Sequence, residues 1–207
     1  MVKYIKKTAT VNLRLSILEK NNLNLELLKL NNKIEKIIKI IYKKLSLGGK
    51  IFLCGNGGSA ADAQHLAAEF LIRLRPNVNR NPIPAISLAM DASTLTACSN
   101  DYDFKYIFSR NLDALGNKGK DVLIGISTSG NSQNIIEALK IAKNNKIISI
   151  GLFGKTGGKA MKYCDLPINI PSDNTARIQE SHIFIGHYIF ERVEDLILQK
   201  RLHIKVK

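Results

Sequence analysis

The residues best suited to chemistry lie in a glycine-rich stretch in the first half of the chain. A short apolar run, Ile51–Leu53, leads into Cys54-Gly-Asn-Gly-Gly-Ser59, and the helix-compatible segment behind it carries His65 and Glu69. Glycines allow close approach to a ligand, and a helix start offers free N–H groups to an anion. A histidine and a glutamate four residues apart share one helix face, where they can ligate a metal ion or move a proton. The stretch predicts a site for a small anionic substrate, with a structural turn and a surface His–Glu hydrogen bond as simpler alternatives.

A hydroxyl-rich loop, Ser127-Thr-Ser-Gly-Asn-Ser132, follows another apolar run. Hydroxyl groups donate to phosphate oxygens, and a helix beginning here would add backbone donors. Capping of that helix needs only one such residue, so the density of hydroxyls favours a phosphate site. The glycine turn carries neither a G-x-G-x-x-G dinucleotide fingerprint nor a P-loop.

A third group of polar residues lies near the C-terminus, in Arg177-Ile-Gln-Glu-Ser-His182 and at His187. Gln179 and His187 are eight residues apart, which corresponds to about 12 Å of helix rise. Spacing alone therefore does not favour their convergence on one site, and His182 competes with His187 for a functional role.

Strands and helices alternate through most of the chain. We predict strands at 51–54, 84–88, 122–127, 147–152 and 166–170, and helices at 58–74, 92–115, 131–144, 156–163 and about 174–199. This alternation predicts a three-layer α/β/α fold with a five-stranded parallel sheet covered on both faces. Ligands bind beyond the carboxyl ends of such strands, where the glycine turn and the hydroxyl-rich loop both lie.

Size and composition suggest a single domain. The chain has 207 residues, 45% of them hydrophobic. We expect residues 49–207 to form the main unit and residues 1–48 to form a helical arm of the same domain, which packs on a neighbouring subunit. Apolar residues at helical spacing between 27 and 45 support this arm, and residues 12–22 are an ambiguous second helix.

Composition also limits location and partners. The chain shows no signal-like segment and no apolar run of the ~20 residues that cross a membrane, and its three cysteines are scattered. The net charge of +14 allows nucleic-acid binding, steering of anionic substrates, or solvated lysines from a biased composition. Because no nucleic-acid recognition motif is present, we favour the last. We expect a cytoplasmic protein with neither membrane nor nucleic-acid partners.

Together and in this order, these segments resemble the sugar isomerase (SIS) domain family, and within it the phosphoheptose isomerases. The likeness is carried by Cys54–His65, Glu69, Asn100–Tyr102, Ser127–Ser132, and Arg177–Glu180 with His187. It covers nearly the whole chain. It implies a flavodoxin-like SIS fold and homotetramers whose active sites lie between subunits.

The resemblance also implies roles for single residues. Glu69 and His187 match the family's acid/base pair. His65, Glu69, Gln179 and His187 match a divalent metal site, with zinc the expected ion. The residues implied to hold the substrate, with the phosphate on the hydroxyl-rich loop, are Asn56, Gly57, Gly58, Ser59, Glu69, Arg73, Asn100, Asp101, Ser127, Thr128, Ser129, Ser132 and Gln179.

The activity implied is conversion of sedoheptulose 7-phosphate to D-glycero-D-manno-heptose 7-phosphate through an enediol(ate). One alternative in the same fold is a non-enzymatic SIS protein that binds the replication initiator, of the DnaA initiator-associating type. Such proteins resemble the isomerases less at the two acid/base positions, and this chain carries Glu69 and His187. A second alternative is an isomerase for a shorter or amino sugar phosphate. An SIS regulator fused to a DNA-binding module is disfavoured because no helix-turn-helix unit accompanies the SIS segment.

Overall fold

The structure is a computed structural model that describes residues 12–89 and 91–205, with side chains as far as Gln199. Its centre is a five-stranded sheet in the order β2-β1-β3-β4-β5, with every neighbouring pair parallel. The strands are β1 (Ile51–Cys54), β2 (Ala85–Ser87), β3 (Val122–Ser127), β4 (Ile148–Gly154) and β5 (Leu166–Ile170). The predicted parallel α/β fold is therefore confirmed.

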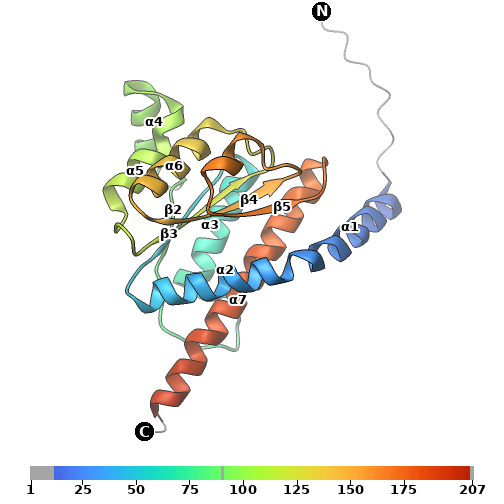
Figure 1. Cartoon of the computed structure of the whole chain (residues 1–207), viewed down its shortest axis with the longest axis vertical. Helices are drawn as coiled ribbons and strands as arrows, with labels where there is room; N and C mark the ends of the chain where they lie inside the picture. The colour runs from blue at the N-terminus through green and yellow to red at the C-terminus, as the bar shows by residue number, and fades with distance from the viewer. Residues whose placement is uncertain (1–11, 90, 206–207) are drawn as a thin grey trace, which may run out of the picture.

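Helices cover both faces of the sheet and complete the three layers (Figure 1). One face packs against α2 (Asn31–Ser46), α3 (Gly58–Leu71) and α7 (Thr175–Lys205). The other face packs against α5 (Ile107–Leu115) and α6 (Gln133–Asn144). Successive side chains of a strand point to opposite faces: Ile51 and Leu53 join the first core, whereas Phe52 and Cys54 join the second.

The N-terminal arm consists of α1 (Leu13–Leu27), the 3-10 turn η1 (Leu28–Leu30) and α2. Helix α2 packs against α7 and crosses it, whereas α1 extends beyond the body of the molecule (Figure 1). Only Leu23 and Leu27 are buried in α1, and its exposed apolar residues include Leu13, Leu15 and Leu25. No described helix combines the length and the apolar character needed to span a membrane.

Three predicted helices end or break differently in the structure. The helix expected at 92–115 is divided into α4 (Ala92–Asp101), η2 (Phe104–Tyr106) and α5, because Asp103 caps a new turn by accepting from the Lys105 N–H at 2.8 Å. The helix expected to reach residue 74 ends at Leu71. The segment predicted at 156–163 is the 3-10 helix η3 (Gly158–Tyr163), whose N-cap Gly157 and first residue Gly158 both have positive φ.

Candidate active site

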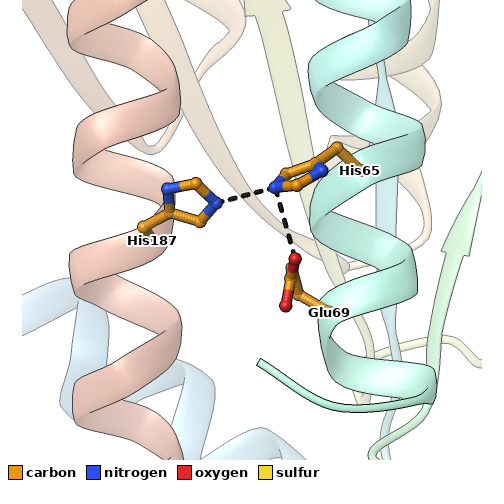
Figure 2. A group of neighbouring side chains, drawn as sticks. All are labelled: His65, Glu69 and His187. Atoms are coloured by element: carbon orange, nitrogen blue, oxygen red, sulfur yellow. Dashed lines mark hydrogen bonds and ion pairs between the residues drawn. The ribbon is translucent and has the colours of Figure 1, made fainter. Parts of the chain in front are cut away.

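Two neighbouring helices, α3 and α7, bring three functional side chains together. His65 and Glu69 project from α3 toward His187 on α7 (Figure 2). The Nε2 atoms of His65 and His187 are 2.8 Å apart, and His65 Nε2 lies 3.3 Å from Glu69 Oε1. The helices approach closely because α7 carries glycine at position 186, where a Cβ would lie only 2.6 Å from Leu66 Cδ1.

The chemistry of this triad favours a shared cation. Both the His187 ring and the Glu69 carboxylate face Nε2 of His65. A single proton on this nitrogen can form a hydrogen bond with only one of these two neighbours at a time. One ligand atom from each residue lies within 4.8 Å of the others. Two imidazoles and a carboxylate form a donor set that suits zinc and related divalent ions. The residues present therefore fit a metal, and half of the His65 side chain remains exposed to an incoming ligand.

Gln179, the fourth expected metal ligand, lies elsewhere on α7. Its amide packs against Gly58 so closely that a Cβ there would lie 2.5 Å from Gln179 Nε2. Gly58 is seven residues before His65, which corresponds to about two turns of α3. Within one chain, the structure therefore joins His65, Glu69 and His187, and places Gln179 beside the glycine turn.

The glycine turn connects β1 to α3. Gly57 has φ +54°, a conformation that favours glycine, and no side chain caps the helix that follows. The Asn56 amide is held by Asn134, each side chain donating to the other at 2.9 and 2.8 Å. Asn134 is only 2% exposed. Our sequence reasoning did not identify Asn134, whose only local signal is its position just after the hydroxyl-rich loop.

The hydroxyl-rich loop follows β3, the strand next to β1 in the sheet. Ser127 Oγ accepts from the Gly130 N–H at 3.1 Å and lies 3.3 Å from Ser132 Oγ. Ser132 stands at the N-cap position of α6 but makes no capping hydrogen bond. Capping therefore does not account for this serine, and the start of α6 keeps backbone donors for an anion. Thr128 and Ser129 line a cavity of about 290 Å³.

Three predicted substrate residues are exposed and form their hydrogen bonds outside the triad. Arg73 follows the end of α3, is exposed, and donates to the Pro76 carbonyl at 3.3 Å. Asn100 and Asp101 end α4, both exposed, with Asn100 Nδ2 donating to Asp101 Oδ1 at 2.8 Å. None of the α4 residues is buried in the described chain, and Figure 1 shows this helix at the outer edge of the molecule.

A buried arginine fixes the far end of α3, and our sequence reasoning did not identify it. The Arg80 side chain is 1% exposed and forms an ion pair with Glu194 of α7, which is fully buried. Arg80 also donates to the backbone carbonyls of Glu69 and Phe70 at 2.7 and 2.9 Å. These contacts tie the backbone of Glu69 to the helix that carries His187. No local pattern marks Arg80, because its partner is 114 residues away.

Comparison with known proteins identifies the family of this chain. The sequence model of the family described as the SIS domain matches residues 21–154. The chain belongs to the SIS domain family. It is 52% identical over 161 residues to the phosphoheptose isomerase of Clostridium acetobutylicum, covering 78% of this chain and 81% of that protein. It is 50% identical over 176 residues to that of Aneurinibacillus thermoaerophilus, covering 85% and 86%.

Comparison with solved structures finds the same kind of protein. A phosphoheptose isomerase from Neisseria gonorrhoeae superimposes with a TM-score of 0.81 at 40% identity, covering 88% of this chain and 96% of that one. One from Francisella tularensis gives a TM-score of 0.84 at 34% identity with the same coverage. The prediction of an SIS-family isomerase rather than a non-enzymatic binding protein is therefore confirmed.

Proposed function

We propose that the chain converts sedoheptulose 7-phosphate to D-glycero-D-manno-heptose 7-phosphate. The observation that carries this proposal is the convergence of Glu69 and His187 on His65 between α3 and α7. Support also comes from relatives named phosphoheptose isomerases at about 50% identity. The product is an intermediate suited to nucleotide-activated heptose for lipopolysaccharide or capsule, made by a cytoplasmic enzyme.

The proposed reaction is a 1,2 proton shift in the ring-opened ketose. The Glu69 carboxylate takes a proton from C1, and the C1–H electron pair forms the C1–C2 double bond of an enediol(ate) while the π pair of the C2 carbonyl moves onto the C2 oxygen. The proton is returned to C2 while the C1 oxygen becomes the aldehyde carbonyl. His187 moves the proton between the two oxygens. Such acid/base steps by positioned side chains typically contribute about 10²- to 10⁴-fold to a rate.

Substrate binding is assigned to the loops at the carboxyl ends of β1 and β3. The phosphate is held by hydroxyl groups and by the start of α6, at Ser127, Thr128, Ser129 and Ser132. The sugar lies over the glycine turn, bounded by Asn56, Gly57, Gly58 and Ser59. The position of Gln179 supports this sugar site, because the Gln179 amide lies against Gly58.

A divalent metal, zinc by its donor types, would be held by His65, Glu69 and His187. Bound there, it would supply Lewis-acid polarisation of the substrate carbonyl. Gln179 is the fourth ligand implied by the family resemblance. Its place beside Gly58 favours contact with the sugar within one chain.

We also propose a homotetramer with active sites between subunits. Supporting this are the exposed apolar residues of α1 and an α4 that buries none of its residues in the described chain. Contact with a neighbouring copy would cover both surfaces. It would also allow Arg73, Asn100 and Asp101 to serve an adjacent site.

The test is turnover of sedoheptulose 7-phosphate by purified protein, with the product followed by NMR. We expect an aldose 7-phosphate to form, and activity to fall after treatment with a chelator and to return on adding zinc. Absence of turnover by metal-loaded protein would contradict the assignment. Turnover that survives removal of all bound metal would contradict the metal's role alone.

A further inference from the structure

The cavity beside the hydroxyl-rich loop has one side whose function is unassigned. Thr128 and Ser129 line it from the loop after β3, and Lys155 and Thr156 line it from the segment just after β4. Asp173, just before α7, contributes a carboxylate. We propose that Lys155 is a substrate-binding residue that contacts the phosphate held by the hydroxyl-rich loop, an inference that rests on the proposed function.

The first argument concerns charge. A phosphate monoester carries about −1.5 to −2 at neutral pH, but residues 127–132 contain no cationic side chain. Hydroxyl groups donate without a formal charge, and a helix start supplies only about half of one. Lys155 is the one cation among the described residues that line this cavity. An ammonium group there would supply the missing charge through a charge-assisted hydrogen bond.

The second argument concerns the backbone. Lys155 has φ +44°, and Lys146 is the one other non-glycine residue with positive φ in the described ranges. Residues other than glycine, asparagine and aspartate are rare in this conformation. The Lys155 N–H donates to the Ile170 carbonyl at 2.7 Å, which ties this conformation to the neighbouring strand. A lysine held in an unfavourable conformation beside a ligand cavity fits a functional role.

The third argument concerns the present partner of the lysine. Lys155 Nζ lies 2.6 Å from Asp173 Oδ1, and both side chains are mostly exposed, at 64% and 72%. Exposed ion pairs are weak, so a phosphate can replace the carboxylate without a large penalty. Asp173 therefore competes with the substrate's phosphate for Lys155. Its removal should strengthen anion binding.

The test compares Lys155→Asn with Lys146→Asn. Asparagine tolerates positive φ, so the substitution removes the charge with little backbone strain, and Lys146 is a matched control because it shares the conformation and lies at the opposite end of β4. For Lys155→Asn we expect KM for sedoheptulose 7-phosphate to rise about 10- to 100-fold, the change expected from losing one charge-assisted hydrogen bond. We expect kcat to stay within about two-fold, Lys155→Arg to recover part of the loss, and Asp173→Asn to lower KM. Lys146→Asn should leave KM unchanged.

A second measurement separates this proposal from the proposed function. Binding of inorganic phosphate, measured by calorimetry on the whole protein, needs no turnover and should weaken in Lys155→Asn by a similar factor. If turnover fails but this loss is seen, the substrate assignment is wrong and the phosphate contact stands. If phosphate binds Lys155→Asn and the wild type equally, or KM is unchanged, Lys155 does not bind the phosphate.

Discussion

Asn56 and Asn134 exchange two side-chain hydrogen bonds, of 2.9 and 2.8 Å, across the carboxyl ends of β1 and β3. The pair joins the glycine turn to the first turn of α6 and so links the proposed sugar and phosphate loops. Asn134 Oδ1 also accepts from the Ile135 N–H at 3.0 Å. Asn134 is therefore a positioning residue for Asn56.

Asn134→Asp should disturb this pair in a pH-dependent way. At neutral pH the new carboxylate faces the Asn56 carbonyl oxygen and loses one of the two bonds, and we expect kcat/KM to fall about 10- to 100-fold, as for other buried unsatisfied groups. Protonation at lower pH restores a donor, so activity relative to wild type should recover there. Asn134→Leu should show the loss without the recovery. If both variants showed the same pH profile of kcat/KM as wild type, the positioning role would be refuted. The control is Asn144→Asp, at the exposed end of α6.

Metal content should follow the triad. We expect the purified protein to hold a divalent ion measurable by elemental analysis, and His65→Ala and His187→Ala to lose most of it because each removes an imidazole donor. Gln179→Ala should retain metal and instead raise KM, since the Gln179 amide lies beside Gly58. Loss of metal from Gln179→Ala as complete as from His65→Ala would show that this glutamine is a ligand in the assembled protein.

His182 should make the protein sensitive to acid. It is fully buried, and neither of its ring nitrogens has a hydrogen-bond partner in the described structure. Burial lowers the pKa of His182 from 6.5 to about 4. The unfolded chain therefore binds this proton below about pH 6.5 while the folded chain does not, so stability contributed by neutral His182 is present above pH 6.5 and is lost as pH falls toward 4. The expected loss is about 3 kcal/mol.

Urea unfolding at several pH values measures this effect. His182→Gln, which does not titrate, should flatten the pH dependence between pH 6.5 and 4, whatever its own stability at neutral pH. Wild type measured under the same conditions provides the comparison. An unchanged slope in His182→Gln would assign the acid sensitivity to other groups.

The ion pair of Arg80 with Glu194 should be costly to break. Both side chains are buried, and removing one partner of a buried pair typically costs about 3–5 kcal/mol. Glu194 keeps a second ion pair, with Arg75 at 2.6 Å, so we expect Arg80→Met to lower the free energy of unfolding toward the lower end of this range. We also expect it to reduce kcat, because Arg80 holds the Glu69 carbonyl. Lys29→Met in the exposed Glu26–Lys29 pair should change stability by less than about 1 kcal/mol. Equal effects of the two substitutions would contradict this assignment.

The sequence predicted the fold more completely than the site. Short apolar runs identified the strands because both faces of a parallel sheet are buried. The break between α4 and α5 was missed because segments on both sides have helical composition and only Asp103 interrupts them. Within the site, His65 and Glu69 are paired by local helix spacing.

The remaining site contacts depend on tertiary packing. His187 lies 122 residues from His65 in the sequence, and their contact requires α3 and α7 to lie side by side. The spacing of Gln179 and His187 argues against their convergence within one helix, and in the structure the Gln179 amide lies beside Gly58; whether Gln179 is a ligand stays a prediction. The contacts of Asn134 and Arg80 join segments far apart in the chain and leave no periodic signal.

The most direct test of the account is the rate of Glu69→Gln on sedoheptulose 7-phosphate, measured beside wild type and a Glu137→Gln control. Glutamine keeps the size of the side chain but cannot take the C1 proton, so we expect kcat to fall by at least about 10²-fold with unchanged melting temperature. His187→Gln should fall similarly, and Glu137→Gln, from an ion pair on α6, should match wild type. A Glu69→Gln variant with wild-type kcat would contradict the central claim that this carboxylate is the base.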